Sequence, residues 1–302
     1  MDLMNIERVM EKIAFPEEAK RAFRALAEKV KANDAVCSDW LKLRDGYIYG
    51  EIDIDSALEQ LRGLSERLGE PNEYGADMLF FLDGAELLER RYLERGIAEE
   101  ILWASLSDLR CKLYECMKVK GCYGTFVAGW YEGFFRLRRF ALGRLQFEKV
   151  AADSELYGYS EAGLTIGRGD VLINMHIPSS GPLTRESRLD AYRRAYEFYA
   201  DERRDGRLIF RCSSWLLYPP YEEVFGEQSN VVSFMRDFTR IFRTDCASFG
   251  DAWRVFGADA NRAADELPRE TRMQRAFADW IARGGSAGGG IGVFVYPDAL
   301  EK

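Results

Sequence analysis

Residues 170–199, with the sequence DVLINMHIPSSGPLTRESRLDAYRRAYEFY, decide the fold of the second half of the chain. The apolar run over residues 171–177 predicts a buried strand, and the small residues at 178–182 predict a loop. A helix is expected to begin near Thr184, where apolar residues start to recur at helical spacing. Such a segment can bind a phosphate, because free backbone N–H groups at a helix N-terminus point at the ligand. The same pattern also fits an ordinary connection in which Thr184 is the N-cap.

Three side chains near this loop could take part in chemistry. Arg185 and Arg188 lie in the first turn of the expected helix, where cations oppose the helix dipole, so an anionic ligand would account for them. Glu186 in the same turn partly offsets their charge. His176 is the only histidine, and an imidazole ordinarily titrates near neutral pH. It is therefore a candidate general base, or a structural histidine that hydrogen-bonds at the end of the strand.

The composition is that of a globular protein, with 302 residues of which 47% are hydrophobic and 30% charged. A net charge of −8 argues against nucleic acid or an anionic membrane surface as the main partner. No apolar run approaches the roughly 20 residues of a membrane span. The six cysteines form no CxxC pair and a single histidine leaves few metal ligands, so no metal site is predicted. Reduced thiols of a cytoplasmic protein are the simplest interpretation.

The hydrophobic pattern changes near residue 139 and predicts two domains. Residues 1–139 are expected to be helical and residues 140–302 to alternate strands and helices, so the expected fold class is α+β. The glycine-rich stretch 284–290 is expected to be a flexible connection, or else a mobile lid over a substrate. The expected helices of the first domain cover residues 2–13, 16–31, 55–68, 74–95 and 97–118. In the second domain we expect strands at 142–150, 171–177, 208–212, 251–256 and 292–296, a hairpin at 156–166, and helices at 184–199, 229–242 and 268–283.

Five segments carry a resemblance to a known family: HIPSSGPL (176–183), CSSWLLYPP (212–220), SNVVSF (229–234), LPRETRMQR (267–275) and GGGIGVF (288–294). Together with the order of strands and helices, they make the second domain similar to the GNAT N-acyltransferases. More closely, the whole chain resembles a bacterial family with a helical N-terminal domain and a GNAT-like C-terminal domain. The resemblance implies a mixed β-sheet flanked by helices over residues 140–302.

The resemblance also implies acetyl-coenzyme A or another acyl-coenzyme A as co-substrate, because the loop after the fourth GNAT strand presents backbone amides to the coenzyme pyrophosphate. The loop here has one glycine and a proline in place of the glycine-rich signature. Asp237 stands where the family has a proton-donating tyrosine. Either another donor serves, with Tyr218 and Tyr221 as the nearest tyrosines and Tyr221 as the candidate acid, or no acid is needed. The residues implied for coenzyme binding are Ile177, Ser179, Ser180, Gly181, Thr184, Arg185 and Asn230.

The expected function is transfer of an acyl group, acetyl above all, from acyl-coenzyme A to an amine of an unidentified small molecule or peptide. His176 would deprotonate the amine directly or through water, with Glu148 on a neighbouring strand as the other candidate base. A backbone N–H near residues 175–177 would stabilise the oxyanion.

Two other functions stay open from the sequence. One is a catalytically impaired GNAT-derived module that binds coenzyme A or a metabolite for regulation, which the departures in the loop and at Asp237 favour. The other is a protein-interaction role for the helical domain, suggested by the aromatic segment at residues 130–135. Burial of these rings against the sheet of the second domain would explain the same segment.

Overall fold

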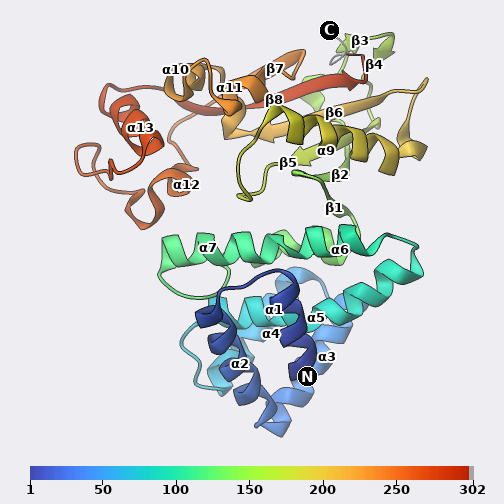
Figure 1. Ribbon diagram of the computed structural model, residues 1–302, viewed down its shortest axis with the longest axis vertical. Helices are drawn as coiled ribbons and strands as arrows, with labels where there is room; N and C mark the ends of the chain where they lie inside the picture. Colours follow the sequence, from blue (N-terminus) through green and yellow to red (C-terminus); the bar gives the residue numbers. More distant parts are fainter. Residues whose placement is uncertain (299–302) are drawn as a thin grey trace. The chain divides into compact units, whose positions relative to one another are not determined.

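The computed structural model describes residues 1–298, and its contacts divide the chain into two compact units, Met1–Phe140 and Ala141–Lys302. The first unit is helical (Figure 1). None of the described helices is long and apolar enough to cross a membrane. The helices of this unit are α1 (Leu3–Lys12), α2 (Glu17–Lys31), α3 (Asp34–Tyr49), α4 (Ile54–Arg67), α5 (Glu73–Glu94), α6 (Glu99–Leu106), α7 (Asp108–Lys120) and α8 (Glu132–Phe135).

Helix α5 is the centre of the first unit, because it packs against α1, α2, α3, α4 and α6. Its residues Phe80 and Phe81 are buried, and Phe81 meets the rings of Tyr131 and Phe135 with centroids 4.7 Å and 5.0 Å away. The rings of the 130–135 segment that are buried therefore pack inside the helical unit itself. Trp130 of the same segment is only partly buried, and the protein-interaction hypothesis stays a prediction.

The second unit is built on a six-stranded sheet with the order β1-β2-β5-β6-β8-β7 and a separate two-stranded hairpin, β3-β4. This arrangement confirms the α+β class expected from the sequence. The strands are β1 (Arg139–Leu142), β2 (Leu145–Ala151), β3 (Ser160–Glu161), β4 (Leu164–Thr165), β5 (Val171–His176), β6 (Leu208–Ser214), β7 (Arg240–Cys246) and β8 (Ala287–Tyr296). The helices are α9 (Arg185–Phe198), α10 (Glu222–Phe225), α11 (Asn230–Met235), α12 (Ala252–Phe256) and α13 (Arg272–Ala282).

Strands β5 and β6 are parallel and are joined through α9, which lies along one face of the sheet (Figure 1). The ring of Tyr192 on α9 packs against Phe210 of β6 and Phe294 of β8, with centroids 5.8 Å and 5.2 Å away. The opposite face carries a second apolar cluster in which the hairpin residue Leu164 joins Leu172 of β5. Each face of the sheet thus has its own apolar cluster.

Three expected elements of this unit differ from the structure. The expected strand over residues 142–150 is present as β2 but begins only at Leu145, because Gly143, at a φ of +72°, lies in a turn between β1 and β2. The expected helix over residues 229–242 ends with α11 at Met235, and its last residues begin β7, which pairs with β8 at seven positions from Arg240 to Cys246. The expected strand over residues 251–256 is the short helix α12.

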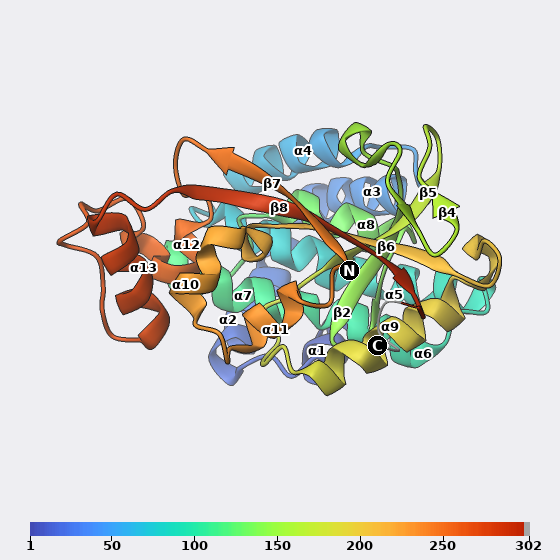
Figure 2. The same ribbon diagram turned by 90° about the horizontal axis from the view of Figure 1, so that it is seen from above.

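The glycine-rich stretch is also different from expectation, because Gly288, Gly289 and Gly290 belong to β8. Figure 2 shows β8 as a long strand with β6 and β7 beside it, and these glycines pair with residues 243–245 of β7. A Cβ built on Gly290 would lie 2.4 Å from the carbonyl oxygen of Leu217 and 2.7 Å from Cγ2 of Ile241. Glycine is needed here so that the backbone at residue 217 can approach the strand. Residues 288–290 are therefore neither a connection nor a lid, whereas residues 284–286 do connect α13 to β8.

We therefore expect Gly290→Ala to destabilise the protein by about 1–3 kcal/mol, since inserted atoms must displace backbone rather than a flexible side chain. The measurement is the urea midpoint of unfolding. Gly250→Ala is the matched control, because a Cβ at Gly250 meets no heavy atom within 4 Å. Equal midpoints for the two variants would contradict the close approach.

Candidate active site

Three neighbouring strands bring polar side chains into one row across the sheet. Glu148 of β2 is in register with Asn174 of β5, and Asn174 is in register with Arg211 of β6. Residues in register on adjacent strands point to the same face, and His176 shares that face because it lies two residues beyond Asn174. Four side chains from three strands therefore meet where β5 ends.

The central contact of this group joins His176 to Glu148. Nε2 of His176 lies 2.6 Å from Oε1 of Glu148, and both side chains are mostly buried, with 21% and 16% of their surfaces exposed. Nδ2 of Asn174 lies 2.9 Å from the same imidazole nitrogen and 3.3 Å from the same carboxylate oxygen. The two bases expected separately from the sequence thus form one hydrogen-bonded pair.

The parallel strands β5 and β6 separate just before this pair. Their registered positions are Ile173 with Phe210 and Asn174 with Arg211. Strand β6 then stays in register with β8 as far as Ser214, whereas β5 ends at His176. Within the described residues, the edge of β5 beyond Asn174 has no registered partner on β6. An extended ligand could hydrogen-bond to the backbone there.

The loop between β5 and α9 is held in place by Arg144 from the turn between β1 and β2. Its Nη2 donates to the carbonyl oxygen of Gly181 at 2.7 Å, and its Nε donates to that of Pro182 at 3.1 Å. Gly181 has a φ of +106°, a conformation that favours glycine. Thr184 is the N-cap of α9, and its hydroxyl accepts from the backbone N–H of Ser187 at 3.3 Å.

The sequence-predicted loop residues accordingly lie on one continuous segment. Ile177 follows the end of β5, and Ser179, Ser180 and Gly181 are exposed before the N-cap Thr184. Arg185, in the first turn of α9, is also exposed and can therefore meet an anionic ligand. Arg188 differs from this expectation, because it is fully buried and pairs with Asp237 through Nε and Oδ2 at 2.5 Å. Its position in the first turn is explained by that ion pair rather than by a ligand.

Family models match both halves of the chain. The model described as the GNAT-like C-terminal domain matches residues 139–294, and the model described as the N-acyltransferase N-terminal domain matches residues 4–137. The chain belongs to the GNAT-like N-acyltransferase family. A comparison with curated protein sequences found no match.

Solved structures of acyltransferases have the same fold as this GNAT-like family member. An acyltransferase variant in complex with octanoyl-CoA is 21% identical, with a TM-score of 0.70 over 95% of this chain and 86% of that one. An acyltransferase in complex with decanoyl-CoA and teicoplanin is 20% identical, with a TM-score of 0.68 over 96% of this chain and 87% of that one. At these identities the likeness establishes the fold, with the helical domain included.

Two other sequence-predicted residues of this GNAT-like chain lie on different elements. Asn230 is exposed at the first position of α11, after its N-cap Ser229. Tyr221 is 1% exposed among aromatic rings that include Phe277, at a centroid distance of 5.0 Å, and burial raises the pKa of its phenol to about 12. Asp237 lies beyond the end of α11, and its oxygens accept from Arg188 and Tyr192. The roles of Asn230 and Tyr221 stay predictions.

Sequence reasoning missed Asn174 and Arg211. Each is a polar residue inside an apolar run, VLINMH for β5 and LIFRC for β6, and this interruption was the available signal. Arg211 donates from Nη1 to Oδ1 of Asn174 at 2.6 Å and from Nε to Oδ2 of Asp153 at 2.5 Å. The group therefore extends from Glu148 to Asp153 as one hydrogen-bonded network.

Among residues 1–298, no group of three or more acidic, cysteine or histidine side chains is placed to hold a metal ion.

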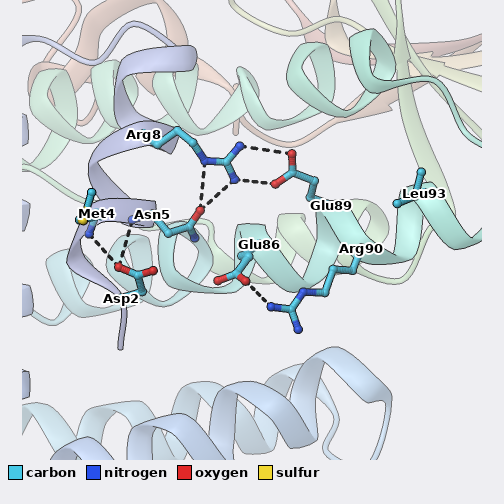
Figure 3. Close-up of a pocket in the computed structure, with 8 residues that line it drawn as sticks. All are labelled: Asp2, Met4, Asn5, Arg8, Glu86, Glu89, Arg90 and Leu93. Carbon is cyan, nitrogen blue, oxygen red and sulfur yellow. Dashed lines mark hydrogen bonds and ion pairs between the residues drawn. The ribbon is translucent and has the colours of Figure 1, made fainter.

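The helical domain of this GNAT-like chain carries a separate surface pocket of about 650 Å³. Figure 3 shows Arg8 at its centre, where Nη2 pairs with Oε2 of Glu89 at 2.5 Å and also donates to Oδ1 of Asn5 at 2.9 Å. Arg90 is paired with Glu86 in the same pocket. The charges that line this pocket are therefore largely matched within it, and none of the predicted site residues lies there.

Proposed function

We propose that this chain transfers an acyl group from acyl-coenzyme A to an amine. The observation that carries the proposal is the contact of 2.6 Å between His176 Nε2 and Glu148 Oε1, at the point where β5 leaves β6 and enters the loop. A carboxylate next to an imidazole favours its protonated form and orients the ring, which suits a general base. Membership of the GNAT-like N-acyltransferase family supports the same reaction.

In the proposed reaction His176 takes a proton from the amine, directly or through water, while the amine nitrogen forms a bond to the thioester carbonyl carbon. The carbonyl oxygen gains negative charge, and a backbone N–H near residues 175–177 stabilises it. The C–S bond then breaks, the thiolate leaves, and the proton on His176 passes to solvent. Because a thiolate is a good leaving group, the step can proceed without an acid. Tyr221 is retained as the candidate donor if one is used.

For the coenzyme, we propose that the segment between β5 and α9 binds the phosphate groups. Its support is the exposed cation Arg185 in the first turn of a fourteen-residue helix, together with the exposed Gly181, where an added Cβ would meet no heavy atom within 4 Å. The other residues proposed for this role are Ile177, Ser179, Ser180, Thr184 and Asn230.

The helical domain is taken as residues 1–139 and the acyltransferase domain as residues 140–302, a division close to that of the contacts and the matched models. The cytoplasm is the proposed location, because all six cysteines are free.

The assay that tests this proposal measures coenzyme A release by the purified protein. Acetyl-, octanoyl- and decanoyl-coenzyme A serve as donors, and a panel of amines and teicoplanin serves as acceptors, because the similar acyltransferases were crystallised with medium-chain coenzymes and teicoplanin. We expect release that requires both donor and acceptor, and an acylated product by mass spectrometry. A protein that shows no turnover and does not bind acyl-coenzyme A by calorimetry would contradict the proposal.

The alternative is a module that binds coenzyme A or a metabolite without turnover. The observation that favours it concerns Asp237, which stands at the position of the family's tyrosine. Its carboxylate accepts hydrogen bonds from Arg188 and Tyr192. The same experiment separates the two functions. Calorimetric binding without release across the whole panel of acceptors would favour the module.

A further inference from the structure

Two cysteines of the helical unit lie in contact at the end of α7. Cys116 lies one turn before the helix ends at Lys120, and the C-cap Gly121, at a φ of +70°, turns the chain back. The turn places Cys122 beside Cys116, with the two Sγ atoms 3.9 Å apart. A disulfide bond is about 2.0 Å long, so the sulfurs need to approach by about 2 Å, which rotation about a Cα–Cβ bond can supply.

The segment that carries Cys122 is fixed to the beginning of α5. Nδ2 of Asn72 donates to the carbonyl oxygen of Tyr123 at 2.9 Å. The backbone N–H of Thr125 donates to the carbonyl oxygen of Tyr74 at 3.0 Å. The second cysteine is therefore held next to the first rather than carried on a free loop, and this proximity favours a bond between them.

The two thiols differ in their access to solvent. Cys116 is 0% exposed, whereas Cys122 is partly exposed. Burial, and then the neighbouring Cys122, raises the pKa of the Cys116 thiol to about 12, so this thiol is protonated in the reduced protein. An oxidant in solution therefore meets Cys122 first. Once Cys122 has reacted it carries no charge, and its contribution to the raised pKa of Cys116 is removed.

Cys111 shows that the contact, rather than burial, distinguishes this pair. It lies on the same helix, is 6% exposed, and burial raises the pKa of its thiol to about 11. All six cysteines lie within residues 1–298, and in that part of the chain the contact of Cys116 with Cys122 is the single contact between two cysteine sulfurs. Cys111 is therefore a buried thiol in a similar environment that lacks a partner for a disulfide.

We propose that Cys116 and Cys122 are a site of reversible oxidation, at which a small-molecule disulfide such as oxidised glutathione converts the two thiols into an intramolecular disulfide. The Cys122 thiolate attacks one sulfur of the oxidant, which forms a mixed disulfide and releases one thiolate. The Cys116 thiolate then attacks the Cys122 sulfur, which forms the bond between the cysteines and releases the second thiolate. Two cysteine thiols are oxidised, one disulfide is reduced to two thiols, and the cysteine protons pass through solvent to the departing thiolates.

The bond fastens the segment after α7 to that helix, and the inference is independent of acyl transfer. In a cytoplasmic protein the reduced thiols are the resting state, and disulfides that form there transiently are typical of redox sensing. The site therefore gives the helical unit two covalent states that follow the oxidant around it.

The first test uses the full-length wild-type protein and oxidised glutathione. Free thiols are blocked with a maleimide before the protein is denatured, and the tryptic peptides are identified by mass spectrometry. Lys118 and Lys120 lie between the two cysteines, so trypsin separates them into peptides 113–118 and 121–136. We expect these two peptides joined by a disulfide, and we expect dithiothreitol to separate them. Their absence, in a sample whose exposed Cys246 has taken up glutathione, would overturn the inference.

The order of the two steps is tested with two variants. Cys116→Ser should stop at the mixed disulfide and keep one glutathione on Cys122. Cys122→Ser should leave Cys116 with a free thiol, because the buried sulfur is not reached from solvent. Cys111→Ser is the matched control and should form the joined peptides at the rate of the wild type. Joined peptides that form at the same rate but include Cys111 in the wild type would overturn the assignment of the pair.

Stability gives a second measurement of the same bond. A disulfide limits the conformations of the unfolded chain, so oxidation should raise the thermal midpoint of unfolding by about 2–5 °C. Cys122→Ser treated with the same oxidant should show no such rise. A wild-type protein whose midpoint is unchanged or lower after the joined peptides have formed would overturn the inference that the bond fastens this segment to α7.

Discussion

Replacing His176 with glutamine is expected to lower kcat/KM for acyl transfer by about 10²–10⁴-fold, the usual contribution of a general base. Glutamine can still donate a hydrogen bond to Glu148, so the pair keeps a polar contact while the base is lost. The amine then has to lose its proton to water. The effect should appear in kcat, since the proposed coenzyme contacts lie on the following loop, α9 and α11. The measurement is steady-state coenzyme A release, together with calorimetric binding of acyl-coenzyme A.

The control for this variant is Lys149→Met. Lys149 is the neighbour of Glu148 on β2, is half exposed, and pairs with Glu202 at 2.8 Å. Because successive side chains of a strand point to opposite faces, this substitution changes a charge next to the site without touching the pair. We expect its rate to equal that of the wild type. Full turnover by His176→Gln would show that another group takes the proton, and Glu148→Gln would then be the next variant to measure.

The sequence predicted the elements whose signals are local. The apolar run of β5 and the N-cap Thr184 of α9 are both properties of a few adjacent residues, and both were located within a residue or two. Strand β7 was missed because its first residues continue the apolar pattern of α11, and what makes them a strand is pairing with β8 some fifty residues later. Hydrogen bonds between distant segments leave little trace in a local pattern.

The candidate site shows the same division. His176 and Glu148 were recognisable as bases from their residue types, but their contact depends on the register of β2 against β5, which places Gln146 opposite His176 and Glu148 opposite Asn174. A shift of one residue would turn Glu148 to the other face. Asn174 and Arg211 were missed for a related reason. A single polar residue in an apolar run acquires a role only when the neighbouring strand supplies its partner.

The second large effect concerns stability, at the ion pair between Arg188 and Asp237. Arg188 is fully buried, and it donates to both carboxylate oxygens of Asp237, to the carbonyl oxygen of Leu183 at 2.8 Å, and to the hydroxyl of Ser233 at 3.0 Å. Burial and the neighbouring carboxylate raise the pKa of Tyr192, whose neutral hydroxyl donates to Asp237 at 2.9 Å. The pair therefore fixes α9 to the segment after α11 and holds the end of the loop between β5 and α9.

We expect Asp237→Ala to destabilise the acyltransferase domain by about 3–5 kcal/mol, because it leaves a buried guanidinium without its counter-ion. The double variant Arg188→Met with Asp237→Leu should recover much of this loss, since it removes both charges and keeps apolar volume. Native-state hydrogen exchange of the α9 amides measures the effect in this domain alone. Arg193→Met on the same helix removes an exposed ion pair with Asp190, with side chains 52% and 39% exposed, and should cost less than about 1 kcal/mol. Two results would show that the pair does not anchor α9. One is that Asp237→Ala loses no more stability than Arg193→Met. The other is that the double variant loses as much stability as Asp237→Ala.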